Sequence, residues 1–284
     1  MKSKSTIALV LIIVALLVII FILTSPFQKA EAPIVSTTPK SDNAYDAIAH
    51  TFVKDEVETG SVSVHITKPV VSGLTNKAIN TVVNDQINKV FADIKSSFLA
   101  ETEGIEIFSK ETKHQLTVTG SAPFVSTDKL FYVDIEIYSY YSGSAHPLTQ
   151  RMVLNFVKET GQLVRLEDIL KKDAVKSSDS VSQNPDIAFR TALSNISYLA
   201  KPKIIEQLTM SIKENDGEGS GADSFEELGA EPKLENYGVF YIHKDKIEWV
   251  FGQYQVAPYV FGEIKITIPM NELRSYLAER AYLK

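Results

Sequence analysis

The feature that most constrains this chain of 284 residues is an uncharged apolar run near its start, IALVLIIVALLVIIFIL at 7–23. A helix of about 20 apolar residues spans the hydrocarbon layer of a bilayer, so residues 7–24 are expected to form a transmembrane anchor. Lys2 and Lys4 precede the run, and flanking positive charge favours the cytoplasmic side. We therefore expect residues 1–6 to form a cytoplasmic tail and the rest of the chain to be extracytoplasmic.

A cleaved secretory signal is the alternative interpretation of the same segment. Ala30-Glu31-Ala32 has the small-x-small form of a cleavage site. The apolar run is longer than the core of a usual signal peptide, however, and Pro33 would follow the cut directly, so a retained single-pass anchor is favoured. Because the sequence contains no cysteine, a lipoprotein anchor is excluded and the external part must fold without disulfides.

Composition separates a stalk from the external domain. Residues 25–44 contain three prolines and many small polar residues without an apolar period, which is typical of a flexible stalk. Outside the two N-terminal lysines the chain has 27 basic and 35 acidic side chains, a formal net charge of −8. This charge disfavours nucleic acid as a partner, because phosphate contacts need a basic surface. It favours solubility and attraction to cationic partners.

Two hydrophobic periodicities predict the main elements. Apolar and polar residues alternate over 61–71 and 129–141, which indicates strands. Across 79–98 the apolar residues recur every three or four positions, which indicates a long amphipathic helix with one buried stripe. In the strand at 129–141 one face is apolar and the other is polar and aromatic. The polar face carries Tyr132, Asp134, Glu136 and Tyr138.

The order of these elements predicts an α+β fold, a mostly antiparallel sheet packed by amphipathic helices and preceded by one transmembrane helix. The external domain divides into an N-terminal strand–helix–strand part, 45–125, and a C-terminal part, 126–284, which together form one continuous fold. Within the second part, Pro202 is expected to interrupt a helical stretch and divide it into two helices.

Several motifs in the second half resemble a bacterial extracytoplasmic domain family. They are YSYYSGSAHPLT at 138–149, NFVKETGQLVRLEDIL at 155–170, YQVAPYVFG at 254–262 and IKITIPMNELRSYL at 264–277. This domain of unknown function is found in lysozyme-sensing anti-sigma-V factors of the RsiV type and in the non-catalytic part of some peptidoglycan deacetylases. The resemblance extends over roughly residues 55–280. It implies a lysozyme-like cationic protein or peptidoglycan as ligand.

The activities of those proteins are not expected to transfer with the domain. Only residues 1–6 precede the expected span, too few for even a small sigma-factor interface. The last family motif ends near the last residue, so we expect no deacetylase unit and no enzymatic activity. Fold-level similarity supports architecture better than it supports function.

His146 raises an alternative, a cell-envelope hydrolase. Ser142 and Ser144 lie close to it in sequence, and Asp134 or Glu136 would have to orient the imidazole as a base. The sequence lacks the strand-to-helix elbow that presents a nucleophilic serine. A shaped hairpin loop is favoured instead, with Gly143 at positive φ and a proline fixing the exit.

Aromatic residues on two constrained loops are the favoured contact residues. A loop rich in tyrosine, glycine and proline suits recognition of a protein or a sugar. We therefore predict a membrane-anchored binding module of unknown oligomeric state, whose contacts lie near 140–147 and 253–260. The predicted binding residues are Tyr140, Tyr141, Gly143, His146, Pro147, Tyr254, Pro258 and Tyr259.

An acidic, glycine-rich loop resembles a calcium-binding loop in part. Asp216, Glu218 and Ser220 occupy its first, third and fifth positions, and Glu227 occupies the twelfth. Glu at the third position departs from the usual Asp or Asn, and no clear second helix follows, so a solvated loop is favoured over calcium binding. The five histidines show no metal-binding spacing, so zinc has little support and no cofactor is expected.

Overall fold

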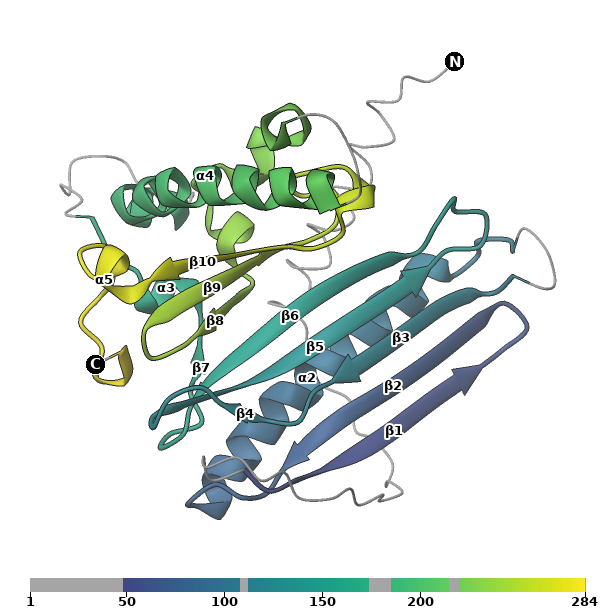
Figure 1. The fold of residues 1–284 in the computed structure, drawn as a ribbon. Helices are drawn as coiled ribbons and strands as arrows, with labels where there is room; N and C mark the ends of the chain where they lie inside the picture. The colour runs from purple at the N-terminus through teal and green to yellow at the C-terminus, as the bar shows by residue number, and fades with distance from the viewer. Residues whose placement is uncertain (1–47, 108–111, 174–184, 215–219, 284) are drawn as a thin grey trace.

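The computed structural model describes residues 48–107, 112–173, 185–214 and 220–283, which form two sheets with a hydrophobic core against each (Figure 1). The predicted anchor at 7–24 and the predicted stalk lie outside the described residues. Among the residues that are described, no helix is long and apolar enough to cross a bilayer. The prediction of an α+β fold with mostly antiparallel strands is confirmed.

The larger sheet has seven strands in the order β1-β2-β3-β5-β6-β7, with β4 beside β5. Its strands are antiparallel except for the parallel pair β2–β3, which is joined by the long helix α2. The bounds are β1 His50–Glu58, β2 Val62–Val71, α2 Lys77–Thr102, β3 His114–Gly120, β4 Phe124–Val125, β5 Leu130–Tyr140, β6 Leu148–Val157 and β7 Leu163–Val164.

Helix α2 begins and packs as its sequence predicts. The Asn76 side chain accepts a hydrogen bond from the Ala78 amide at 2.8 Å, which caps the first turn. Its apolar stripe lies on β2 and β3 and covers one face of the large sheet (Figure 1). The buried members include Val83, Ile87, Val90, Phe91, Ile94 and Phe98.

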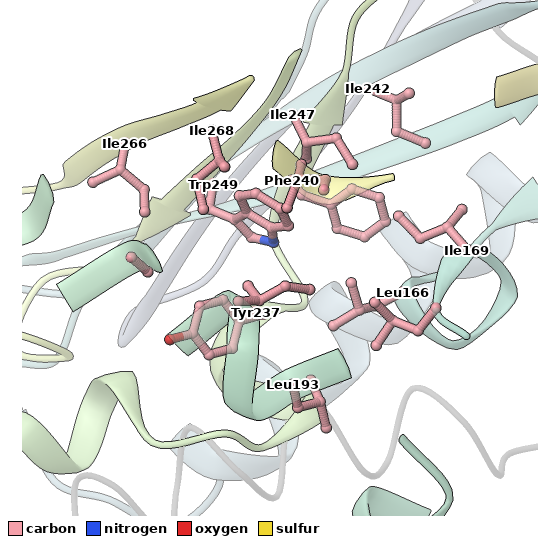
Figure 2. Close-up of a cluster of buried hydrophobic side chains, with 14 of the residues drawn as sticks. Leu166, Ile169, Leu193, Tyr237, Phe240, Ile242, Ile247, Trp249, Ile266 and Ile268 are labelled. Carbon is pink, nitrogen blue, oxygen red and sulfur yellow. The ribbon is translucent and has the colours of Figure 1, made fainter. Parts of the chain in front are cut away.

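The smaller sheet has three antiparallel strands in the order β10-β9-β8, and α4 lies over it (Figure 1). Figure 2 shows the core between them, where the indole of Trp249 lies among isoleucines and near the ring of Phe240. The bounds are α3 Leu166–Ile169, η1 Pro185–Phe189, α4 Arg190–Glu214, η2 Gly221–Ser224, η3 Glu227–Ala230, η4 Leu234–Tyr237, β8 Phe240–Ile242, β9 Lys246–Phe251, η5 Tyr259–Phe261, β10 Ile264–Pro269, α5 Met270–Leu273 and η6 Ala281–Leu283.

The prediction that Pro202 divides the helical stretch is wrong, because α4 runs through it from Arg190 to Glu214. Proline removes one intrahelical hydrogen bond, the one to the carbonyl four residues earlier, which belongs to Tyr198. Pro202 and Tyr198 are both exposed, so water can satisfy that carbonyl. The buried face of the helix is therefore unaffected.

Polar side chains join the two sheets. Asn155 on β6 is 1% exposed and donates to the Phe240 carbonyl on β8 at 2.8 Å. Tyr241, the next residue on β8, donates its hydroxyl to Asp134 on β5 at 2.9 Å. The smaller sheet therefore contacts the face of β5 and β6 that α2 leaves uncovered. The face predicted to be polar is, at this end, an interface within the molecule.

Candidate binding site

The connection between β5 and β6 is the predicted hairpin loop. Gly143 has φ +89°, the left-handed conformation expected of it. The Ser144 amide donates to the Tyr141 carbonyl at 2.8 Å and closes the turn. The side chain of His146 emerges just beyond this turn, before β6 begins.

The structure brings this loop against the aromatic loop between β9 and β10. The imidazole of His146 stacks on the ring of Tyr259, with centroids 3.8 Å apart and planes at 23°. Its Nε2 lies 2.8 Å from the hydroxyl of Tyr254, and the two tyrosine rings are 5.5 Å apart. We call His146, Tyr254 and Tyr259 the aromatic cluster. His146 and two tyrosines more than 100 positions further along the chain, all three predicted contact residues, thus form one surface feature.

The aromatic loop, residues 252–263, is fixed by hydrogen bonds. The side chain of Gln253 accepts from the Thr149 amide at 2.9 Å, which ties the loop to the start of β6. Gln255 donates to the Gly229 and Asn236 carbonyls at 3.1 and 2.9 Å. Tyr254 has φ +64°, the only positive value for a non-glycine among the described residues, so its backbone is strained. Its side chain is nevertheless 47% exposed.

Arg151 fixes the far end of the aromatic loop. From β6 its guanidinium contacts Asp134 at 2.6 Å, Glu263 at 3.0 Å and Glu136 at 3.5 Å. Burial lowers the pKa of Arg151, but attraction to Asp134 and Glu263 outweighs it and raises the pKa above its usual value. Since Glu263 directly precedes β10, this ion-pair network positions the aromatic loop over the larger sheet.

Tyr141 is directed away from the aromatic cluster. Its hydroxyl donates to Glu101 near the end of α2, and its ring packs 5.5 Å from that of Phe98. Burial and the hydrogen bond to Glu101 raise the pKa of Tyr141. Tyr140, Pro147 and Pro258 are at least partly exposed around the two loops. Among the predicted contact residues, Tyr141 is thus occupied by an intramolecular role.

Among the described residues, His146 does not contact either of the carboxylates, Asp134 and Glu136, that the hydrolase alternative assigns to it. Asp134 is held by Arg151 and Tyr241, and five residues separate it from Ser139, the last residue of β5 paired with β6. At about 3.3 Å per residue these positions are roughly 17 Å apart, and His146 lies in the loop beyond. Glu136 is roughly 10 Å from Ser139 by the same measure. The two ring nitrogens of His146 lie instead 3.2 Å from the Pro147 carbonyl oxygen and 2.8 Å from the Tyr254 hydroxyl, so neither carboxylate orients the imidazole.

The calcium-like loop is described only in part. Asp216 and Glu218 lie outside the described residues. Ser220 uses its hydroxyl to accept from the Ala222 amide at 3.2 Å. Glu227 pairs with Lys201 at 2.6 Å, a contact that lowers the pKa of this carboxyl. Both described candidates thus have partners within the chain, and calcium binding stays a prediction.

Two exposed apolar residues, one on the aromatic loop and one on the turn packed against it, were missed. Val260 is 83% exposed and directly follows Tyr259. Leu228 is 74% exposed on η3, the turn that packs on the aromatic loop through Gly229 and Gln255. Val260 lies within the predicted contact loop at 253–260, so the sequence could have identified it as a contact residue. Leu228 is a single apolar residue in an acidic segment, and no local pattern marks it.

Comparison with known proteins confirms the resemblance. Residues 156–271 match the family model described as "Protein of unknown function (DUF3298)". The anti-sigma-V factor RsiV of Bacillus subtilis (strain 168) is 23% identical over 243 residues, which cover 83% of this chain and 73% of RsiV. The peptidoglycan-N-acetylmuramic acid deacetylase PdaC of the same organism is 29% identical over 140 residues, 49% of this chain but only 25% of PdaC.

Two crystal structures share the fold. A DUF3298-family protein of Bacteroides fragilis NCTC 9343 has a TM-score of 0.53 at 16% identity, covering 84% of this chain and 98% of its own. A DUF3298-family protein of Pseudomonas aeruginosa PAO1 has a TM-score of 0.50 at 12% identity, covering 82% and 95%. At these identities the similarity shows the fold alone.

Proposed function

We propose that this chain, whose residues 156–271 match the DUF3298 family, is an extracytoplasmic binding module held at the cell envelope. The observation that supports it best is the aromatic cluster. Two loops from different sheets meet there, and hydrogen bonds and ion pairs hold both in place. Binding of a ligand to loops that are already ordered costs less conformational entropy than binding to mobile ones.

The membrane anchor is part of this proposal. The apolar run at 7–23 has the length and the flanking lysines of a single-pass span with a cytoplasmic N-terminus. It would place the domain outside the membrane, where cell-wall material and secreted proteins are the available ligands. The similarity to an anti-sigma factor and to a peptidoglycan deacetylase supports a place in the envelope.

The ligand we propose is a lysozyme-like cationic protein or a peptidoglycan fragment. The tyrosine hydroxyls and the His146 imidazole of the aromatic cluster suit either ligand, because these side chains offer apolar rings together with hydrogen-bonding groups. The acidic character of the external part would speed the approach of a cationic protein more than it would tighten the complex. We assign no catalytic step to the aromatic cluster.

Calorimetric titration of the full chain, solubilised in detergent, tests the proposal. One arm adds lysozyme and the other adds soluble peptidoglycan fragments, each up to high micromolar concentration. Saturable heat in one arm identifies the ligand class. If lysozyme binds, stopped-flow measurement of its association rate should show slower association at higher salt, because screening weakens long-range attraction. Absence of binding in both arms would reject both ligand classes.

A further inference from the structure

A buried histidine links the hairpin loop to the end of α2. His114, the first residue of β3, is 0% exposed. Its Nδ1 accepts a hydrogen bond from the Ser142 amide at 3.0 Å. Its Nε2 lies 3.5 Å from the carbonyl oxygen of Ile105, in the segment that follows α2. One imidazole thus joins two surface segments from the inside.

The two contacts determine the protonation state that fits. A backbone amide can only donate, so Nδ1 facing Ser142 must be an unprotonated acceptor. The ring proton then lies on Nε2 and is directed at the Ile105 carbonyl. A protonated imidazole carries hydrogens on both nitrogens, so it would oppose the Ser142 N–H with an N–H of its own. It would also place a charge where no solvent reaches, which is costly without a partner.

The charged groups around His114 do not compensate for such a charge. The ring of Tyr141 lies with its centroid 6.2 Å from that of His114, and the Tyr141 hydroxyl is already bonded to Glu101. Glu103 and Glu106 in the segment after α2 are exposed. Lys113 is bonded to Glu58 on β1. Among the described residues, no carboxylate forms an ion pair with His114.

We propose that His114 is a pH-sensitive latch on the candidate binding site. The neutral ring holds the hairpin loop closed through Ser142, and proton uptake releases the loop. His146 lies four residues beyond Ser142, so release would also disturb its stack on Tyr259. Opening of the loop at acid pH would weaken ligand binding, and only this consequence rests on the proposed function. The opening itself can be measured without a ligand.

The sign of the pH dependence follows from the linkage between protonation and opening. The closed state needs the neutral ring, whereas a histidine released to water takes up a proton near pH 6.5. The closed loop is therefore favoured above this pH and lost progressively below it. For one proton, the opening equilibrium constant should rise about tenfold per pH unit below about 6.5.

Hydrogen–deuterium exchange of the ligand-free full chain tests the latch. Exchange of residues 140–147 is compared at pH 7.5 and 5.5 after correction for the intrinsic pH dependence of amide exchange. The wild type should lose about tenfold of its protection in this segment. His114→Asn keeps an acceptor near Nδ1 but cannot be protonated, so its protection should not change with pH.

Two variants separate His114 from other histidines. His65→Asn removes an exposed ring on β2, and His50→Asn removes a ring at the start of β1; both should retain the wild-type response. Equal protection of the wild type at both pH values would overturn the latch. So would a response that survives in His114→Asn or disappears in His65→Asn.

A spectroscopic measurement keeps the test independent of mutant folding. In the wild type labelled with ¹⁵N-histidine, the shifts at pH 7.5 should show one ring protonated only at Nε2. A buried ring protonated at Nδ1 would contradict the hydrogen bond from Ser142.

Discussion

Arg151 meets Asp134, Glu136 and Glu263 where the two sheets come together, with only 15% of its side chain exposed. Removing the cation leaves partly buried carboxylates without a partner, which is costlier than losing a surface ion pair. Arg151→Met should lower the free energy of unfolding by about 3 kcal/mol in urea titration. Lys95→Met removes the more exposed pair with Asp55 and should cost less than about 1 kcal/mol. Equal effects would contradict the role of the network.

Burial of Tyr237 should make the free energy of unfolding depend on pH in the alkaline range. It is fully buried, its hydroxyl donates to the Ala230 carbonyl at 2.9 Å, and burial raises its pKa to about 12. An unfolded tyrosine ionises near pH 10, so the folded state holds its proton longer and stability falls as pH rises from about 10 to 12. This residue should contribute about 1.4 kcal/mol per pH unit there. Tyr237→Phe should flatten that part of the stability curve, whereas Tyr198→Phe, on an exposed ring, should not.

At the scale of elements, the turn η3 and the aromatic loop are in close contact. A Cβ added at Gly229 would lie 1.6 Å from the Gln255 carbonyl oxygen, so the loop must move to accommodate it. Gly229→Ala should therefore displace the loop and weaken ligand binding at least tenfold in calorimetric titration. Gly238→Ala is the matched control, because its Cβ would make contacts of 3.6 Å or more and its backbone is α-helical. Similar affinities for both variants would contradict this packing.

The elements that the sequence predicts well are those with local periodicity. The strand at 61–71 and the helical stripe across 79–98 appear as β2 and α2, because alternation and three- or four-residue spacing report which side is buried. Pro202 does not end the helix as predicted, since proline lowers helix propensity locally while packing of the buried face of α4 decides the outcome. Element identity is thus a local property, but element length also depends on tertiary contacts.

At the scale of the whole molecule, the arrangement of the two sheets could not be predicted. It depends on contacts such as Asn155 with the Phe240 carbonyl, which join residues 85 positions apart. The aromatic cluster was half predicted: composition identified both loops, but only the fold shows that His146 lies on Tyr259. It also shows that Tyr141 is turned inward to Glu101. Local patterns specify candidates, and tertiary pairing decides which of them meet.

The central claim is that the aromatic cluster binds the ligand, and a paired titration tests it most directly. Tyr259→Ala should weaken binding of the ligand identified by calorimetry at least tenfold, since central aromatic residues dominate interfaces. Its thermal midpoint should stay close to that of the wild type. Phe124→Ala is the matched control, an aromatic residue on β4 that is 52% exposed and pairs with the start of β5, and it should bind as the wild type does. Unchanged affinity in Tyr259→Ala, or an equal loss in both variants, would contradict the claim.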